Sequence, residues 1–352
     1  MTDRKSIRWG IAGTGTIARQ FASDISFAEG AILTAVSARD PAKAQELASH
    51  HSGVAAFGSL ESMIRSQAVD AVYIATLNTV HHAQALECIA AGIPVLVEKP
   101  LTANLAQALE IRAAARAAEV FVMEAMWCRY LPAVRAARSA LRNGAIGAVQ
   151  RLEADIAWKV EFDPASRFFS KTGGGGALHD IGIYPVSLAR YFLGHPVSIE
   201  SSWCAAPSGV DMAATVRMRF ETAETEIQCS FDRNGSNRLV IEGDKGVMVL
   251  GPLFISARGF SIYPTRRLAD LAQPGGNTVA AWISRKLFRR LPLPHTVHHE
   301  HQFAGTGLQF EIEAASSAIR QGLTEEPDNS LDDTIAALRI IDGILVSPPV
   351  AE

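Results

Sequence analysis

The sequence predicts two domains: an α/β domain built on a parallel sheet, followed by an α+β domain built on an antiparallel sheet. Its 352 residues exceed the length at which one hydrophobic core usually stops growing. Over the first 125 residues, short apolar runs alternate with Ala-rich amphipathic stretches, whereas after about residue 150 strand-like runs follow one another with little helix between them. We therefore expect a first domain over residues 1–125 and a second over 126–352.

The strands of the first domain are predicted by runs that are rich in Val and Ile and apolar on both faces. Such runs occur at 7–13, 32–38, 71–76, 95–100 and 120–125, with helical stretches between them at 41–50, 80–91 and 102–118. A strand that is apolar on both faces suits a sheet that helices cover on both sides, which is the usual setting of parallel strands.

The strands of the second domain are predicted by runs that turns separate. They lie at 151–158, 198–206, 212–220, 225–231, 238–244 and 246–251. A final helix, at about 331–345, has apolar positions at helical spacing and is a candidate to pack back on the first domain.

Composition excludes several classes of protein. Hydrophobic residues make up 48% of the chain and charged residues 20%, which is ordinary for a globular protein, and the net charge of −3 gives no argument for a nucleic-acid partner. The four cysteines are scattered, as expected for reduced thiols rather than a disulfide framework or a zinc site. No apolar run is long enough to span a bilayer, and the first strand starts too early to leave room for a signal peptide. We expect a soluble cytoplasmic protein with no metal and no membrane partner.

The segment from Arg266 to His301 does not fit the pattern of strands and helices predicted for the second domain. "AAWISRKLFRRLPLP" interleaves basic and apolar residues, and a His-rich "HTVHHEH" follows it. One interpretation is a membrane-surface helix. Another is a metal site made by His298, His299 and His301, although their spacing fits no structural zinc template well. We favour a solvated surface insertion.

A glycine motif directly after the first strand predicts a dinucleotide site. The motif is Gly13-x-Gly15-x-x-Ala18, between a strand and a helix. In such a turn Gly13 permits the tight bend, Gly15 lets the backbone approach a pyrophosphate, and Ala18 keeps helix and strand close. The N-terminus of the helix then faces the phosphates, and the strand–turn–helix–strand setting makes the motif specific.

The end of the second strand favours NADP over NAD. NAD enzymes usually carry Asp or Glu at this point to hold the ribose hydroxyls. Here Ser37, Ala38 and Arg39 stand there instead, so a carboxylate that would repel a 2′-phosphate is missing and Arg39 can pair with that phosphate. Asp40, directly before Pro41, is predicted to cap the next helix.

Further polar side chains follow neighbouring strands, at the sheet edge where ligands bind. Thr76 and Asn78 follow one strand, and Asn78 or Thr79 could cap the helix after it, either in place of a ligand role or in addition to one. Lys99 follows the next strand in "VLVEKPL", and Pro100 restricts its backbone, so that the starting direction of the lysine side chain is set. Glu98 either positions this lysine or caps the sheet.

The second domain offers an acid–base pair in "GGGGALHDIGIYP". Asp180 and Tyr184 are four residues apart on a predicted helix and so lie on one face, and Pro185 is expected to bend that helix just past Tyr184. An Asp, a Tyr and a Lys together can move a hydroxyl proton while hydride leaves the same carbon. Because the reference pKa of Tyr is about 10, the tyrosine needs a nearby cation to act as a base at neutral pH.

These motifs, in this order and spacing, resemble the Gfo/Idh/MocA oxidoreductase family (glucose–fructose oxidoreductase, inositol dehydrogenase and relatives). They are GxGxxA, "ATLNTVHHAQA", "EKPL", "MEAMWCRYLP" and "GGGGALHDIGIYP". "GTGLQFEIEAASSAIRQG" near the C-terminus extends the resemblance to essentially the whole chain, although the segment 266–301 departs from the family pattern. "MEAMWxRxxP" and "DIGIYP" are most similar to the dimeric dihydrodiol dehydrogenase and sugar dehydrogenase branch.

The resemblance implies a Rossmann domain and a second domain with a large, open, mostly antiparallel sheet. One sheet face would cover the active site, and the other would form the interface of a homodimer or homotetramer. Lys99 and Asp180 would be catalytic, with Tyr184 where many relatives carry His. Trp127 and Arg129 would line the pocket, or else serve as a core residue and an ion-pair residue. The expected cofactor-binding residues are Gly13, Gly15, Thr16, Ile17, Ala18, Ser37, Arg39, Thr76, Asn78, His81, Glu98, Lys99, Trp127 and Arg129.

We therefore expect an NADP-dependent dehydrogenase or reductase that acts on a hydroxyl of a sugar, polyol or cyclic diol. Tyr184 would take the hydroxyl proton with the help of the Lys99 charge, and Asp180 would orient the hydroxyl. One alternative is a bound-cofactor enzyme of the same fold that exchanges oxidation states between sugars or hydrolyses a glycoside. Another is a non-catalytic NADP-binding sensor, which the complete set of Lys99, Asp180 and Tyr184 argues against. The exact substrate and the physiological direction stay open.

Overall fold

The computed structural model describes residues 6–276, 278–291 and 293–350, which form two compact units, each built on one sheet. The first unit contains the described residues up to Trp127 together with Ala304–Arg339. The second contains Cys128–Phe303 and the described residues from Ile340 onward. The fold class predicted from the sequence, a parallel sheet followed by a mostly antiparallel one, is confirmed. The units differ from the predicted ranges 1–125 and 126–352 because the chain returns to the first unit after completing the second sheet.

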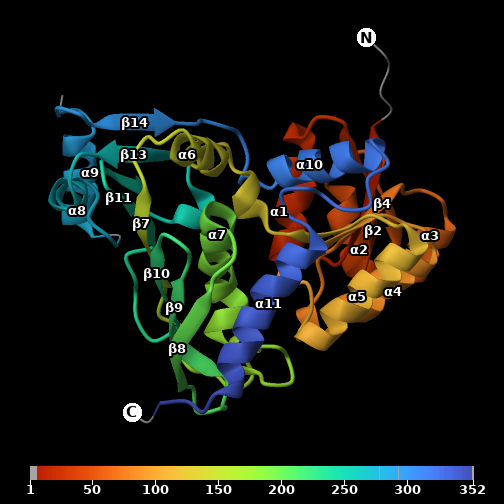
Figure 1. Cartoon of the computed structure of the whole chain (residues 1–352). Coiled ribbons are helices and arrows are strands. Elements are labelled where there is room, and N and C mark those ends of the chain that lie inside the picture. The colour runs from red at the N-terminus through yellow and green to blue at the C-terminus, as the bar shows by residue number, and fades with distance from the viewer. Residues whose placement is uncertain (1–5, 277, 292, 351–352) are drawn as a thin grey trace. The chain divides into compact units, whose positions relative to one another are not determined.

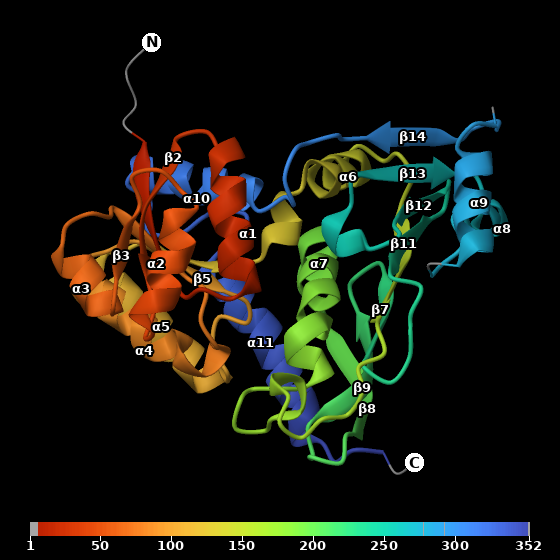
Figure 2. The ribbon, with the colours of Figure 1, turned by 180° about the vertical axis from the view of Figure 1, so that it is seen from behind.

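The first unit is a doubly wound parallel sheet (Figures 1 and 2). Its elements are β1 (Ile7–Ala12), α1 (Thr16–Asp24), β2 (Ala31–Ser37), α2 (Pro41–Ser49), β3 (Ala55–Phe57), α3 (Leu60–Arg65), β4 (Ala71–Ile74), α4 (Asn78–Ala90), β5 (Val95–Glu98), α5 (Leu105–Ala118), β6 (Val122–Ala125) and α10 (Gln309–Arg320). The strand order β3-β2-β1-β4-β5-β6 reverses between β1 and β4. Dinucleotides bind at the carboxyl ends of the strands at such a reversal. The short β3 was not predicted, because a run of three residues, Ala-Ala-Phe, is too short to give a strand signal.

An aromatic cluster joins the sheet to α1 and α10. Trp9 of β1 is fully buried, its ring meets the edge of Phe21 of α1 at 5.9 Å, and Phe21 stacks on Tyr73 of β4 at 4.0 Å. The indole Nε1 of Trp9 donates a hydrogen bond of 2.9 Å to the Ser316 hydroxyl of α10. Both helices therefore cover the face of the sheet from which Trp9 projects.

The returning segment is held by one buried carboxylate. Asp24, at the end of α1, is 1% exposed, and its Oδ2 accepts hydrogen bonds from the backbone N–H groups of Thr306, Gly307 and Leu308 at 2.8 to 3.1 Å. A carboxylate that accepts several N–H bonds tolerates burial that would otherwise be costly. This bond set fixes the start of α10 against the first unit.

The second unit is an eight-stranded sheet with helices packed on it. Its main elements are α6 (Pro132–Arg142), β7 (Val149–Ala157), α7 (Ile183–Leu193), β8 (Ser198–Ala205), β9 (Asp211–Arg219), β10 (Glu224–Ser230), β11 (Arg238–Gly243), β12 (Val247–Leu250), β13 (Gly259–Tyr263), α8 (Arg266–Ala272), α9 (Val279–Phe288) and β14 (Val297–Glu300). The strand order is β14-β13-β12-β11-β7-β10-β9-β8, antiparallel except between β7 and β10. The last helix, α11 (Leu331–Val346), begins in the first unit and ends in the second.

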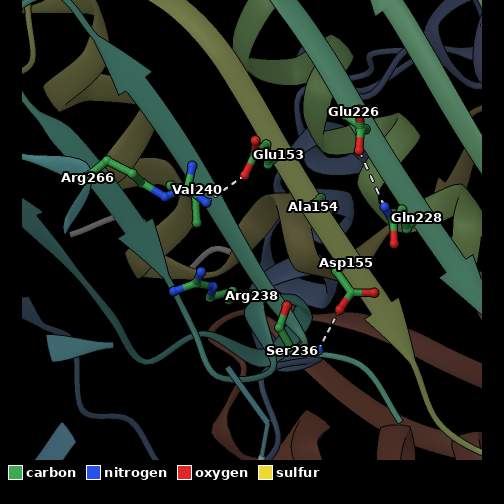
Figure 3. Close-up of a pocket in the computed structure, with 9 residues that line it drawn as sticks. All are labelled: Glu153, Ala154, Asp155, Glu226, Gln228, Ser236, Arg238, Val240 and Arg266. Carbon is green, nitrogen blue, oxygen red and sulfur yellow. Dashed lines mark hydrogen bonds and ion pairs between the residues drawn. The ribbon is translucent and has the colours of Figure 1, made fainter. Parts of the chain in front are cut away.

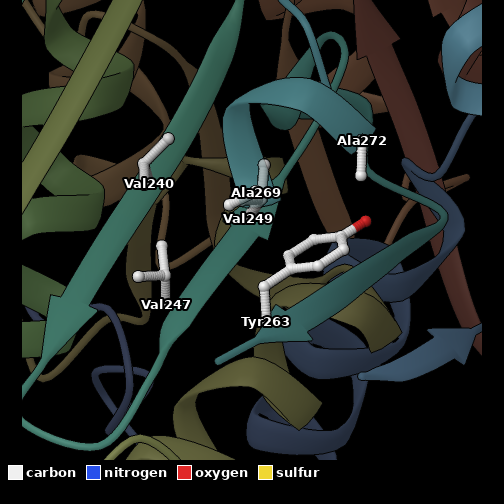
Figure 4. Close-up of a cluster of buried hydrophobic side chains, with 6 residues drawn as sticks. All are labelled: Val240, Val247, Val249, Tyr263, Ala269 and Ala272. Atoms are coloured by element: carbon white, nitrogen blue, oxygen red, sulfur yellow. The ribbon is translucent and has the colours of Figure 1, made fainter. Parts of the chain in front are cut away.

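The basic and His-rich segment is part of this sheet, so the prediction of a solvated insertion is wrong for much of it. Ala269 and Ala272 of α8 pack on Val240, Val249 and Tyr263 of the sheet (Figure 4). β14 pairs with β13 along the sheet edge and was missed because three of its four residues are polar, which gives no strand signal. In contrast, α9 exposes several large apolar side chains, among them Trp282, Ile283 and Leu287.

The histidines of this segment have structural neighbours. The Nδ1 atom of His298 lies 2.7 Å from the Ser261 hydroxyl, and the ring of His299 stacks on Phe260 at 4.3 Å. Among the residues that the structure describes, no group of three or more His, Cys, Asp or Glu side chains is arranged to hold a metal ion. A helix long and apolar enough to cross a membrane is likewise not found in the described ranges.

Candidate active site

The glycine turn after β1 fits the pyrophosphate of a dinucleotide. Gly13 has φ +121°, and a Cβ there would lie 2.5 Å from the Ala75 carbonyl oxygen, so a side chain is excluded on both counts. Gly15 is the N-cap residue of α1, and a Cβ on it would meet no atom within 4 Å, so the space above it is open. Ala18 is fully buried in the helix–sheet contact, and Thr16 and Ile17 present the first turn of the helix. The turn therefore has the open approach and the helix N-terminus that a phosphate requires.

The end of β2 places Arg39 on the surface. Ser37 is 2% exposed, and its hydroxyl lies 3.5 Å from the Ile11 carbonyl oxygen, whereas Arg39 is exposed. The capping role predicted for Asp40 is confirmed, because its Oδ1 accepts a 3.0 Å hydrogen bond from the Ala42 N–H and Pro41 is the first residue of α2. Asp40 is thus occupied by its helix, which leaves Arg39 as the charged side chain available at this strand end.

His81 joins the loops that follow β4 and β5. It is 1% exposed, its Nδ1 lies 3.1 Å from the Pro100 carbonyl oxygen, and its Nε2 lies 3.3 Å from that of Thr76. Burial lowers the pKa of His81, against three backbone hydrogen bonds, with Pro100, Thr76 and Leu101, that raise it. A neutral ring can donate to only one of the two carbonyls. The Thr76 hydroxyl donates to Gln84 at 2.7 Å.

The predicted capping role of Asn78 is wrong. α4 begins at Asn78 itself, and Leu77 occupies the N-cap position. Asn78 therefore lies in the first turn of the helix, directly after β4, at the edge of the sheet that carries the glycine turn.

Two buried carboxylates hold the backbone around Lys99. Glu98 is 6% exposed; the Tyr73 hydroxyl donates to its Oε1, and the backbone N–H of Lys99 donates to its Oε2 at 3.1 Å. Glu124 of β6 accepts from the N–H of Leu101 at 2.8 Å. Burial raises the pKa of Glu98 to about 7, while the Tyr73 hydrogen bond and the Lys99 charge oppose that rise. The half-buried Lys99 thus leaves β5 from a backbone that carboxylates anchor on both sides of Pro100.

The structure gives Arg129 a supporting role in the second unit. It is 2% exposed, its Nε lies 2.8 Å from the Ser187 hydroxyl, and its Nη2 lies 3.1 Å from the Ser187 carbonyl oxygen. The guanidinium also lies 5.5 Å from the ring centroid of Tyr191, so it braces α7. Trp127, the last residue of the first unit before the return segment, is half-buried.

Asp180 lies in a π-turn rather than in a regular α-helix. This turn spans Leu178–Gly182 and leads into α7, a feature that often marks functional sites. The Oδ1 atom of Asp180 lies 3.3 Å from Nη1 of Arg167, and Tyr184 is 7% exposed in the first turn of α7. The bend expected just past Tyr184 stays a prediction; Pro185 is the third residue of α7, and the departure from a regular α-helix lies in the π-turn directly before α7.

Asp211 supports this turn and was missed by the sequence analysis. It is 1% exposed, and its Oδ2 accepts a 2.6 Å hydrogen bond from the Leu178 N–H at the start of the π-turn. Burial raises the pKa of the Asp211 carboxyl. A charged residue heading a partly buried strand was the available signal. For Arg167, which lies in a loop between strands, the sequence offered none.

A separate hollow lies on the second sheet, away from these residues (Figure 3). It is lined by Glu153, Ala154, Asp155, Glu226, Gln228, Ser236, Arg238, Val240 and Arg266. Its walls are tied by polar contacts, such as the 2.7 Å ion pair of Arg266 with Glu153 and the 2.5 Å bond from the Ser236 N–H to Asp155. These lining residues include none of the predicted catalytic or cofactor-binding residues, so this hollow is not the predicted site.

Comparisons with known proteins agree with this geometry. A family model described as "Oxidoreductase family, NAD-binding Rossmann fold" matches residues 7–126, and one described as "GFO/IDH/MocA C-terminal domain" matches residues 134–249. The trans-1,2-dihydrobenzene-1,2-diol dehydrogenase of Xenopus laevis is 32% identical over 343 residues, covering 96% of this chain and 97% of the relative. The enzyme of the same name from Mus musculus is 33% identical over 328 residues, covering 92% and 91%.

Solved structures share the fold. The aldose–aldose oxidoreductase of Caulobacter crescentus has a TM-score of 0.80 and 22% identity, covering 97% of this chain and 96% of that chain. A 3-ketoreductase from Actinomadura kijaniata, solved with NADP, has a TM-score of 0.76 and 20% identity, covering 98% of both chains.

The glycine turn, the doubly wound sheet and these relatives together define an NAD(P)-binding oxidoreductase, a dehydrogenase that acts on CH–OH groups. The chain belongs to the GFO/IDH/MocA family.

Proposed function

We propose that this dehydrogenase uses NADP to interconvert a hydroxyl and a carbonyl group on a sugar, a polyol or a cyclic diol. The observation that carries the proposal is the position of Lys99 within the first unit. It follows β5, at the carboxyl edge of the parallel sheet that also holds the glycine turn after β1 and Thr76 after β4. That edge is where a dinucleotide binds in a sheet of this order. The named substrates of the relatives, a cyclic diol and aldoses, support the substrate class.

The preference for NADP rests on the end of β2. Ser37 is short and turned inward, Asp40 is occupied by its helix, and Arg39 is exposed. An arginine pairs well with a phosphate through charge-assisted hydrogen bonds. When bound, the nicotinamide supplies the redox chemistry. The cofactor-binding residues proposed in the first unit are Gly13, Gly15, Thr16, Ile17, Ala18, Ser37, Arg39, Thr76, Asn78, His81, Glu98, Lys99 and Trp127.

The proton chemistry is assigned to three side chains. Tyr184 takes the proton of the substrate hydroxyl, or returns it to the carbonyl in the reverse reaction. Asp180 accepts a hydrogen bond from the substrate and orients it, and Lys99 supplies the positive charge that favours the deprotonated oxygen. General acid–base help of this kind contributes about 10²- to 10⁴-fold to the rate.

The test is a spectrophotometric panel with NADP⁺ and NAD⁺ against aldoses, inositols and cyclic diols, followed by Tyr184→Phe on the best substrate. Tyr184→Phe should lower kcat by about 10²- to 10⁴-fold and leave the Kd for NADPH unchanged. Tyr191→Phe, on the same helix and 6% exposed, is the matched control and should keep wild-type kcat. Near-normal turnover by Tyr184→Phe would reject Tyr184 as the proton carrier, and a tenfold preference for NAD⁺ would reject the role of Arg39.

The second sheet is assigned to self-association, as a homodimer or homotetramer. The sheet face that carries the hollow bears ion pairs between basic and acidic side chains, including Arg217 with Glu226 at 3.1 Å and Arg266 with Glu153 at 2.7 Å. A face with interleaved charges of both signs can complement a second copy of itself across a two-fold axis. Light scattering after size exclusion tests this, and a monomer at micromolar concentration would contradict it.

The enzyme is placed in the cytoplasm. All four cysteines, Cys88, Cys128, Cys204 and Cys229, are free thiols, which suits a reducing compartment. Fractionation of the source cells tests this, and recovery of the chain outside the cytoplasmic fraction would contradict it.

A further inference from the structure

Three carboxyl groups are buried together in the first unit, beneath the loop that carries Lys99. They belong to Glu98 at the end of β5, Glu124 on β6 and Glu311 on α10, and their residues are 6%, 1% and 0% exposed. Each of the two strand glutamates contributes to the electrostatics of Glu311, so the three form one interacting cluster. Three negative charges cannot share such a site, because each raises the cost of ionising the others.

The three carboxyl groups differ in the hydrogen bonds that they accept. Glu98 accepts from the Tyr73 hydroxyl and the Lys99 N–H. Glu124 accepts from the Leu101 N–H at 2.8 Å and from the Thr334 hydroxyl at 3.2 Å. In the part of the chain that the structure describes, neither side-chain oxygen of Glu311 has a hydrogen-bond partner.

An ionised carboxylate without a donor is the least stable of the three. Hydrogen bonds from N–H and O–H groups favour the charged form, and burial without them favours the neutral one. Burial, followed by the charges of Glu98 and Glu124, raises the pKa of Glu311 well above its usual range. Glu311 is therefore the carboxyl group of the cluster that holds a proton, and Glu98 and Glu124 are the groups that accept hydrogen bonds from the backbone.

We infer that Glu98 and Glu124 are positioning residues that hold the Lys99–Leu101 loop by its backbone, and that Glu311 is kept as a neutral acid, which lowers the cost of ionising the other two. The first part rests on the catalytic role proposed for Lys99, whereas the state of Glu311 does not. The groups that interact with Glu98 are Tyr73, Lys99, Glu124 and Glu311. The lysine supplies positive charge and Glu124 the opposing one.

The neutral state of Glu311 is tested by infrared difference spectroscopy of wild type against Glu311→Gln at pH 8. The wild-type protein should show a protonated-carboxyl C=O band that is missing from the variant. Gln has the size and neutrality of the protonated acid, so the variant should keep its fold and its kcat within about twofold. If the band is unchanged in the variant, Glu311 does not carry the proton and the inference is overturned.

The positioning role is tested by comparing Glu98→Leu with Glu98→Gln. Loss of the acceptor should displace the lysine loop and lower kcat on the order of 10- to 100-fold, a larger effect than on the Kd for NADPH. Gln can still accept the Lys99 N–H, so it should restore most of the activity. Glu61→Leu, an exposed glutamate of α3, is the control and should behave as wild type. Equal losses in Glu98→Leu and Glu98→Gln would overturn the role, and so would a wild-type kcat in Glu98→Leu.

The two parts fail separately. If Lys99→Ala keeps wild-type turnover, the proposed function loses its lysine, but the infrared band of Glu311 still decides the state of the cluster. If Glu98→Leu does not fold, Glu98→Gln remains informative, because a large loss of kcat in this near-isosteric variant contradicts positioning through an accepted N–H.

Discussion

Glu311→Gln should make the protein more stable than wild type, and by a margin that grows with pH. The wild-type chain takes up a proton at Glu311 when it folds, because the side chain is fully buried and without a hydrogen-bond partner in the described structure. The unfolded chain releases that proton above a pH of about 4.3. Gln is neutral in both states, so the variant folds without this proton uptake.

The sign follows from the raised pKa. A carboxyl whose folded pKa lies above its unfolded value contributes its full stability at low pH and loses it as the pH rises. While Glu311 stays protonated in the folded state, the free energy of unfolding falls by about 1.4 kcal/mol per pH unit. Between pH 6 and pH 8 the advantage of Glu311→Gln over wild type should therefore grow, by up to about 2.7 kcal/mol for a carboxyl that stays protonated throughout. Buried acids outside the cluster, such as Asp211, are present in both proteins and cancel in the difference.

The assay is urea unfolding of both proteins at pH 6 and pH 8, followed by tryptophan fluorescence. Trp9 is fully buried and bonded to Ser316 of α10, so it reports on the environment of Glu311. Ile312→Val, next to Glu311 and also fully buried, is the control and should cost about 0.5–1.5 kcal/mol equally at both pH values. A difference between Glu311→Gln and wild type that is the same at pH 6 and pH 8 would refute the reasoning.

Three further substitutions test single features of the nucleotide end. Arg39→Ala should raise the Kd for NADP⁺ by about 10- to 100-fold and spare NAD⁺, measured by calorimetry with Arg65→Ala as the control; equal effects on both nucleotides would contradict a phosphate contact. Gly13→Ala brings a Cβ to 2.5 Å from the Ala75 carbonyl oxygen at φ +121°. The variant should therefore lose the rise in melting temperature that NADPH produces in wild type; a retained rise would contradict a role of the glycine turn in binding the pyrophosphate. Asp40→Ala removes the cap of α2 and should cost about 1 kcal/mol of unfolding free energy in urea, with NADP⁺ binding kept; no loss of stability would show the cap to be unimportant.

The features that the sequence predicted correctly are those with local physical causes. The strands β1, β2, β4, β5 and β6 were predictable because burial on both faces leaves an apolar run in the sequence itself. Gly13 and Asp40 were predictable because a positive φ and a helix N-cap each select their residue type within a few positions.

Features that depend on distant partners were not predictable. The return of Ala304–Arg339 to the first unit depends on the bonds of Asp24 to three amides almost 300 positions away, and no local pattern encodes them. The contact of Arg129 with Ser187, 58 positions along the chain, is another such feature. The sequence did contain one indication of the carboxyl cluster, which our prediction did not use. Glu311 lies among Leu308, Ile312 and Ala315, on the apolar face of its helix.

Glu98 and Lys99, the charge pair at the end of β5, act together: the carboxylate of Glu98 holds the backbone from which the Lys99 side chain projects. Glu98 turns into the core, where it meets the hydroxyl of Tyr73, and its other oxygen accepts the amide of the very next residue. The cost of burying that carboxylate is offset only while these donors are in place, so the bond that stabilises Glu98 also fixes the backbone of Lys99. A glutamine in that place would keep the geometry, and a leucine would lose it. A further carboxyl group nearby can persist only without charge, which is why the state of Glu311 bears on how firmly the lysine is held.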